Sequence, residues 1–309
     1  MTFFQELKRR LWMILSVTRQ NRDSIITLLV FLVLLVICTA AGYWLIFRLG
    51  RATPIMLAVG VATILTCLIR KKELASLGWG WGSWRYQWLS YGLPLAIALL
   101  AYLPIWMSGF GEWFDTVFVL EQKAEYNLGE WSNAGIIAFH FLLTATFSFV
   151  LALPAVLGEE MGWRGFLVPE LARFMPFTGV ALVSGVIWSA WHLPLFMMGV
   201  YGAEGTPMYY QLFFFTLLLV SNSVTMTYLR FKTGSLWTAV FFHASGNVFI
   251  QKFFAPMTLA NENSAWFVDE FGAIPALVAL SVGVYFWRKG KAEFAAPVRG
   301  HPVQLDPGA

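Results

Sequence analysis

Two adjacent carboxylates and an arginine stand inside an apolar stretch of this sequence, in the run GEEMGWRGFL at 158–167. Residues four apart share one face of a helix, so Arg164 can pair with Glu160 and keep that carboxylate ionised. Glu159 points about 100° away and lacks this partner. Two neighbouring carboxylates in different surroundings suit separate roles, one as a general base and one as a positioning group. An ion pair that decorates a helix end would explain the same residues without any chemistry.

Two histidines and an asparagine add polar groups to other apolar stretches. His192 is followed by Pro194, which can kink a helix and open a cavity beside it. His243 and Asn247 are four residues apart, and on a shared helix face they could together stabilise a developing oxyanion. A hydrogen bond that holds two helices together would explain this pair equally well. Ionisable residues at membrane depth are rare and costly, so the combination on three helices indicates a candidate hydrolytic site.

A metal site is a second interpretation of the same side chains. The sequence has no H-E-x-x-H zinc motif, and Cys38 and Cys67 lie in separate apolar blocks, where free cysteines usually act as small buried side chains. Zinc could still be bound by Glu159, His192 and His243, because mixed carboxylate and histidine ligands with an open position suit catalytic zinc.

The elements that would position these residues are membrane-spanning helices. Of the 309 residues, 58% are hydrophobic and 12% are charged, about half the charged fraction of a soluble domain. A spanning helix needs about 20 mainly apolar residues. The predicted spans are 25–47, 54–69, 88–108, 134–157, 177–198, 209–229, 235–254 and 266–287. The expected fold class is an all-α polytopic membrane bundle of about eight transmembrane helices.

The basic residues predict the orientation of this bundle. With the N-terminus in the cytoplasm, all of the 21 Lys and Arg residues except Arg48, Arg51, Lys123 and Lys252 fall on the cytoplasmic side. Both termini are therefore expected to be cytoplasmic, in a multi-pass protein of a bacterial inner membrane. The net charge of +4 follows from this topology, so the lipid bilayer is the expected partner and nucleic acid is not. The sequence gives no indication of an oligomer.

The chain divides into three parts on composition. Residues 1–24 form a basic amphipathic segment, which is expected to lie as an interfacial helix on an anionic leaflet. Residues 25–289 form one membrane-embedded core, with the motifs concentrated in 155–250. Residues 290–309 combine Pro, Gly and mixed charge and are expected to be a disordered tail.

Three motifs taken together resemble one known family. GEEMGWRGFL at 158–167, WHLP at 191–194 and HASGN at 243–247 match in order and interval the motifs of the CAAX-processing and bacteriocin-immunity family. This family includes the endopeptidases that remove the last three residues of prenylated proteins. The flanking helices match only in number and character. The resemblance implies an eight-helix intramembrane protease whose cavity opens to the cytosol.

The resemblance also implies a role for each motif residue. By motif position, Glu159 would pair with His192 to activate water, and His243 and Asn247 would form the oxyanion hole. The family is described both as metal-dependent and as glutamate-type. We favour the glutamate type, without a cofactor, because His243 and Asn247 make sense together as an oxyanion hole. Zinc is the alternative.

The remaining motif residues and the substrate follow from the same resemblance. Glu160 and Arg164 would order the site or contact the substrate. The expected reaction is hydrolysis of a peptide bond in a membrane-associated protein or peptide, which in this family can be prenylated. A non-enzymatic immunity or scaffold protein of the same fold is one alternative, because fold does not fix function. A proton-coupled transporter is another, since intramembrane Glu, His and Arg also form proton relays.

Overall fold

The computed structural model describes residues 3–50 and 53–294, with the backbone alone for residues 3–20. Its α-helices up to the middle of the chain are α1 (Phe3–Leu49), α2 (Thr53–Arg70), α3 (Trp84–Met107), α4 (Thr116–Glu125), α5 (Asn133–Leu143), α6 (Phe149–Glu160) and α7 (Val168–Ala172). The later ones are α8 (Phe177–Met197), α9 (Met208–Thr233), α10 (Trp237–Gly246), α11 (Ser264–Phe267) and α12 (Ala273–Glu293). A short 3-10 helix, η1 (Leu74–Leu77), precedes α3.

Three π-helical segments interrupt these helices. They are η2 (Thr144–Ser148), η3 (Met161–Leu167) and η4 (Asn247–Phe254). Short π-helical stretches are rare, and they occur frequently at functional sites. Here η3 begins directly after Glu160 and η4 begins at Asn247, so two of the three lie at the motifs found in the sequence.

The predicted all-α membrane bundle is confirmed. Six helical runs within the described residues are long and apolar enough to cross a membrane: Asn21–Leu49, Thr53–Arg70, Trp84–Met107, Asn133–Ala172, Phe177–Met197 and Met208–Thr233. The predicted count of eight is not confirmed, nor is the cytoplasmic placement of the termini. The two remaining predicted spans fall on α10 with η4, where the α-helix ends at Gly246, and on α12, which carries basic residues in its last turns.

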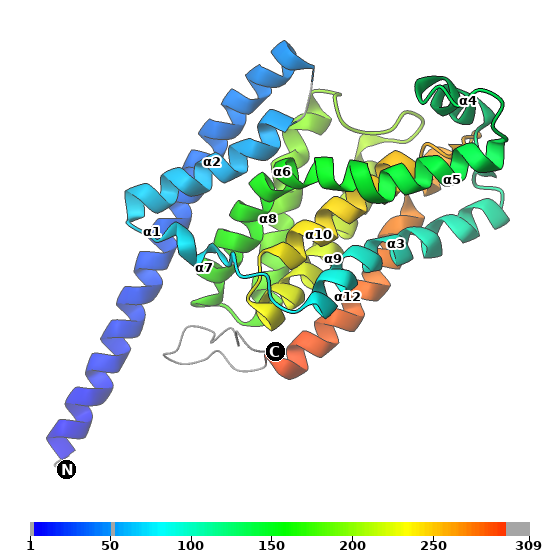
Figure 1. Ribbon diagram of the computed structural model, residues 1–309. Helices are drawn as coiled ribbons and strands as arrows, with labels where there is room; N and C mark the ends of the chain where they lie inside the picture. Colours follow the sequence, from blue (N-terminus) through cyan, green and yellow to red (C-terminus); the bar gives the residue numbers. More distant parts are fainter. Residues whose placement is uncertain (1–2, 51–52, 295–309) are drawn as a thin grey trace.

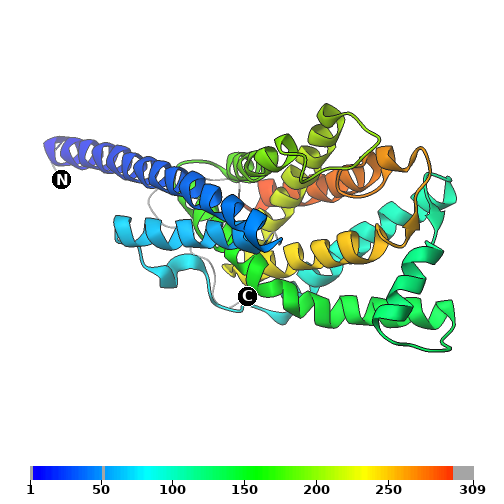
Figure 2. The same cartoon turned by 90° about the horizontal axis from the view of Figure 1, so that it is seen from above.

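The helices pack as neighbouring pairs around the motif region. α1 lies along α2, α9 lies against both α8 and α12, and α10 contacts α3 and α6 (Figure 1). The N-terminal part of α1 projects away from the bundle in both views (Figure 2). The predicted amphipathic segment 1–24 is therefore continuous with the first span from Phe3 onward. Of the predicted tail, residues 290–293 belong to α12, and the part from residue 295 lies outside the described residues.

The helix that carries the two carboxylates is longer than predicted. The span expected at 134–157 is part of a helical run of 40 residues, Asn133–Ala172, which passes through both η2 and η3. Because this run continues beyond Glu159, the carboxylates lie within the bundle rather than at a helix end. This places them at the same depth as residues in the second half of α8.

Glycines of the first motif allow α6 to approach α2 closely. A Cβ atom on Gly60 would lie 2.9 Å from the carbonyl oxygen of Gly158, and a Cβ atom on Gly162 would collide with the Val59 side chain. Small residues four apart are typical of tightly packed membrane helices. The spacing of Gly158 and Gly162 therefore fixes the position of the helix that carries Glu159.

A short antiparallel strand pair joins two connections at one end of the bundle. Strand β1 (Glu112–Trp113) pairs antiparallel with β2 (Thr258–Leu259), with Trp113 opposite Thr258. The connection between α3 and α5 therefore lies beside the segment that leads from η4 towards α12. Both segments belong to the same face of the molecule.

Candidate functional site

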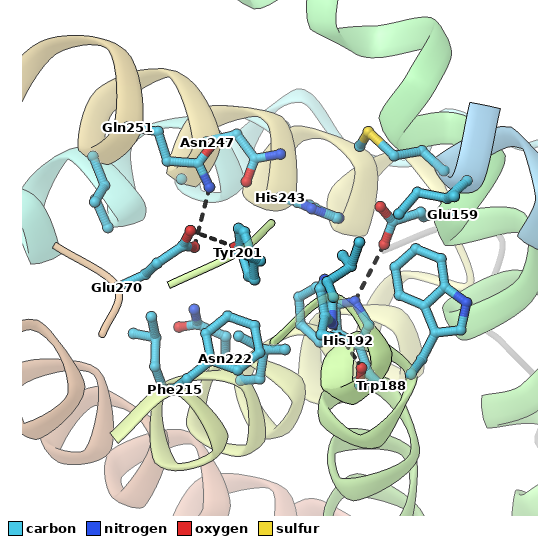
Figure 3. Close-up of a pocket in the computed structure, with 18 of the residues that line it drawn as sticks. Glu159, Trp188, His192, Tyr201, Phe215, Asn222, His243, Asn247, Gln251 and Glu270 are labelled. Carbon is cyan, nitrogen blue, oxygen red and sulfur yellow. Dashed lines mark hydrogen bonds between the residues drawn. The ribbon is translucent and has the colours of Figure 1, made fainter. Parts of the chain in front are cut away.

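The four residues predicted to be catalytic line one cavity of about 360 Å³. Glu159 comes from α6, His192 from α8, His243 from α10 and Asn247 from the start of η4. Figure 3 shows these side chains around a common space, with His243 between Glu159 and Asn247. Apolar side chains such as Phe215 form much of the remaining wall. The arrangement is a set of polar groups in largely apolar surroundings, which is typical of small-molecule and substrate sites.

Glu159 is held by two indole groups. Nε1 of Trp163 and Nε1 of Trp188 each donate a hydrogen bond to Oε2 of Glu159, both at 3.2 Å. The Glu159 side chain is buried, with 3% of its surface exposed. Because both donors use Oε2, the other carboxylate oxygen, Oε1, is the one left to accept a proton or to bind water.

Glu160 has different partners from Glu159, as the sequence predicted. Nη1 of Arg164 donates to both carboxylate oxygens of Glu160, at 3.0 and 3.1 Å, and both side chains are 0% exposed. Nδ1 of His243 lies 2.8 Å from Oε1 of Glu160. The guanidinium carbon of Arg164 also lies 4.3 Å from the ring centre of Trp188. Glu160 and Arg164 therefore fix the positions of His243 and Trp188, which themselves face the cavity.

The described hydrogen bonds of Glu159 and His192 go to other groups, so the predicted pairing of these two residues to activate water stays a prediction. Nδ1 of His192 instead lies 2.9 Å from the backbone oxygen of Trp188. A carbonyl oxygen can only accept, so this nitrogen carries the proton and Nε2 is the acceptor of a neutral ring. Trp188 thus contacts Glu159 through its indole and His192 through its backbone. The two residues therefore share the cavity and a common neighbour.

The cavity also contains polar residues that were not predicted from the sequence. Tyr201, Asn222, Gln251 and Glu270 also line it. Oη of Tyr201 donates to Oε1 of Glu270, and Nε2 of Gln251 donates to Oε2 of Glu270 at 3.1 Å (Figure 3). One signal was available for Glu270, because the predicted span 266–287 included this carboxylate beside Asp269. Tyr201 lies in the connection between α8 and α9 and has no such signal.

The Tyr201 ring links the two ends of the cavity. It stacks on the ring of His192, with centroids 5.8 Å apart and planes at 24°. Its hydroxyl group reaches the opposite end, where it meets Glu270. Burial, together with the neighbouring charge of Asp269, raises the pKa of Glu270 from 4.5 to about 7. The protonated form of Glu270 therefore persists to a higher pH than in a solvent-exposed glutamate.

The raised pKa of Glu270 predicts a pH dependence of stability. Because its pKa is raised, Glu270 keeps its proton in the folded state at pH values where the unfolded chain has lost it. The resulting stabilisation of the folded state is fully present below about pH 4.5 and is lost as the pH rises through about 7. We expect the Tm in detergent to fall from pH 5 to pH 8, and to fall less in Glu270→Gln. Equal slopes for the two proteins would contradict the assignment.

The residues considered for zinc, Glu159, His192 and His243, line the same cavity. Within residues 3–50 and 53–294, no group of three or more His, Cys, Asp and Glu side chains could hold a metal ion. The preference for a site without a cofactor stays a prediction, and chelation in the experiment described below tests it.

Comparison with known proteins identifies the same part of the chain. Residues 137–249 match the family described as type II CAAX prenyl endopeptidase Rce1-like. The chain is also similar to CAAX prenyl protease 2 of Methanococcus maripaludis, with 31% identity over 111 residues. That match covers 35% of this chain and 36% of the relative, so it spans about a third of each protein.

The matched region contains every element that contributes a predicted catalytic residue. It begins within α5 and ends in η4, and so includes all three motifs, from GEEMGWRGFL to HASGN. Residues 137–249 are therefore related to the type II CAAX prenyl endopeptidases, which confirms the resemblance that the three motifs indicated.

Proposed function

We propose that this protein is an intramembrane endopeptidase that hydrolyses a peptide bond of a membrane-associated protein or peptide. The observation that carries the proposal is the meeting of Glu159, His192, His243 and Asn247 in one cavity within the region related to CAAX prenyl endopeptidases. A water molecule, a base and hydrogen-bond donors to the carbonyl oxygen are what peptide hydrolysis requires.

In the proposed reaction, Glu159 is the general base. Its Oε1 accepts a proton from a water molecule that also donates to Nε2 of His192, and the water oxygen attacks the carbonyl carbon of the substrate. The carbonyl oxygen becomes an oxyanion. When the C–N bond breaks, the proton held by Glu159 passes to the leaving amine, which restores the carboxylate.

The oxyanion would be bound by His243 and Asn247. Because Nδ1 of His243 faces Glu160 at 2.8 Å, Nε2 is the nitrogen available to the cavity. The Glu160 carboxylate accepts a hydrogen bond from Nδ1, so Nδ1 carries a proton. Nε2 can therefore donate to the oxyanion only when both ring nitrogens of His243 are protonated. The amide of Asn247, one helical turn further along, is the second donor.

The test is cleavage of defined peptides by the purified protein in lipid nanodiscs. Farnesylated and unmodified peptides of identical sequence are incubated with the protein, with and without a zinc chelator, and the products are identified by mass spectrometry. Peptides cut by the wild-type protein in chelator, with ¹⁸O from labelled water in the new carboxyl group, would support the glutamate mechanism. Loss of cleavage in chelator with recovery on added zinc would contradict it. Absence of cleavage in every peptide of a varied library would favour the immunity or scaffold alternative.

A second prediction concerns the indole that positions Glu159. Trp188→Phe removes one of the two donors to Oε2 but keeps an aromatic ring beside Arg164. A hydrogen bond to a charged group contributes about 1.5–3 kcal/mol, and the Trp163 donor remains, so we expect kcat to fall about tenfold with little change in KM. Trp287→Phe is the matched control, because that indole binds Thr178 far from the cavity. Equal kcat values for the two variants would remove Trp188 from the mechanism.

A further inference from the structure

The cavity extends from Glu159 towards one end of the bundle. Its outer lining comes from the end of α1 at Gly50, from Val200 and Tyr201 after α8, from Gln251 in η4 and from Glu270 before α12. Gly50, Val200 and Gln251 are exposed. In Figure 3, Gln251 and Glu270 lie at one side of the space and Glu159 at the other. This end of the cavity is called the mouth below.

The opposite end of the bundle is closed beneath the site. Trp163 and Arg164, which follow Glu159 along the helix in the direction of α7, are fully buried. Arg230, which is 2% exposed, donates from Nε to the backbone oxygen of Arg164 at 2.9 Å and from Nη2 to that of Leu77 at 3.2 Å. Its Nη1 donates to the backbone oxygen of Gly234. The guanidinium thus ties two connections to the underside of the site.

None of the described residues in the connections at this closed end lines the cavity. Those connections are α2 to α3, α7 to α8 and α9 to α10. Water and a polypeptide would therefore have to displace a layer of buried side chains to enter from there. At the mouth, the path to Glu159 already exists.

The two ends of the bundle differ in basic residues. At the mouth end the described Lys and Arg residues are Arg48, Lys123 and Lys252. At the closed end, the Lys and Arg residues whose side chains are described are Arg22, Arg70, Lys71, Lys72, Arg85, Arg173, Arg230, Lys232, Arg288, Lys289 and Lys291, while Arg164 is buried at the site itself. An excess of Lys and Arg in short connections marks the cytoplasmic side of a membrane protein. The distribution of basic residues therefore predicts that the closed end is the cytoplasmic end.

We infer that the cavity opens on the extracytoplasmic side of the membrane and takes its substrate from there. The inference rests on the proposed function for the word substrate, while the direction of opening rests on the geometry and the charges alone. It reverses the cytosolic opening that the family resemblance implies. The substrate class that fits is an extracytoplasmic segment of a membrane-anchored polypeptide, rather than the cytosolic end of a prenylated protein.

Cysteine accessibility tests the direction of opening without any catalysis. Cys38 and Cys67 are replaced by Ala, and single cysteines are introduced as Val200→Cys at the mouth, Asn222→Cys within the cavity and Lys72→Cys at the closed end. A membrane-impermeant cationic methanethiosulfonate is applied to right-side-out and to inverted vesicles. We expect Val200→Cys and Asn222→Cys to react at least tenfold faster in right-side-out vesicles, and Lys72→Cys to react faster in inverted ones.

Reaction of Asn222→Cys from the inverted side, or from neither side, would overturn the inference. If Asn222→Cys does not reach the membrane, Gln251→Cys replaces it, because that exposed side chain lines the same cavity. The labelling is repeated with Glu159→Gln, where the pattern is expected to persist. Peptides cleaved by the wild-type protein should then be cut only in right-side-out vesicles. Labelling from outside without any cleavage would count against the protease alone, whereas cleavage only in inverted vesicles would count against the direction of opening alone.

Discussion

Replacing Glu159 with glutamine is expected to lower kcat by about 10³-fold while the protein stays folded. General-base catalysis contributes about 10²–10⁴-fold, and the amide keeps the size of the side chain but cannot take a proton from water. The two indole donors to Oε2 can still bind the amide oxygen at the same position. Single-turnover cleavage of a peptide that the wild-type protein cuts measures the effect, with thermal unfolding in detergent as the check on folding.

The control for this prediction is Glu73→Gln. Glu73 is an exposed glutamate that lies just before η1 and does not line the cavity. The Glu73→Gln variant removes one carboxylate charge, as Glu159→Gln does. Its kcat is expected to stay within about twofold of the wild-type value. Cleavage by Glu159→Gln at a rate similar to that of Glu73→Gln would show that Glu159 is not the base. A cell that needs the protein but tolerates Glu159→Gln would favour the scaffold alternative.

The spans of the fold were largely predictable from apolar runs. The predicted segment 177–198 corresponds to α8 at Phe177–Met197, because a run of apolar residues between polar ends specifies both the helix and its limits. The end of the fourth helix was not predictable in this way. Glu159, Glu160 and Arg164 looked like the polar boundary of a span, whereas the helix continues past them, and Glu160 pairs with Arg164 and His243 inside the bundle.

The π-helical interruptions of the helices could not be predicted from the sequence either. The π-helical segments depend on how a helix packs against its neighbours, and no local residue pattern marks Asn247 as the beginning of one. α10 is apolar enough to suggest a span, but its α-helix ends at Gly246, and α12 carries its basic residues within the helix. These two segments account for the difference between eight predicted spans and six.

The candidate site was predictable where residue type and spacing were informative. The four-residue spacing of Glu160 and Arg164 predicted their ion pair, which the structure contains. The partners of Glu159 were not predictable, because Trp188 comes from another helix and tryptophan is common in membrane proteins for other reasons. Tyr201 was missed because it lies in a connection, where side-chain positions depend on the tertiary structure rather than on helical periodicity.

Replacing Arg164 with methionine is expected to be the most destabilising single change in the site. The change leaves the fully buried Glu160 carboxylate without its cation, and removing one member of a buried ion pair costs about 3–5 kcal/mol. The contact of the guanidinium with the Trp188 ring is lost as well. At about 2–4 °C per kcal/mol for a chain of moderate size, the Tm in detergent should fall by about 10 °C.

The double variant Glu160→Gln with Arg164→Met separates charge from packing. If the uncompensated carboxylate causes the loss, the double variant should recover most of the Tm, because replacing both members of a buried pair is often neutral. Arg173→Met is the matched control, since Arg173 is 40% exposed and its partner Glu170 keeps Lys72 at 3.4 Å; its cost should be about 1 kcal/mol or less. A double variant no more stable than Arg164→Met would instead assign the loss to the cavity left by the side chain. Recovery of stability without recovery of cleavage would show that the pair is retained because it holds His243 and Trp188 in place.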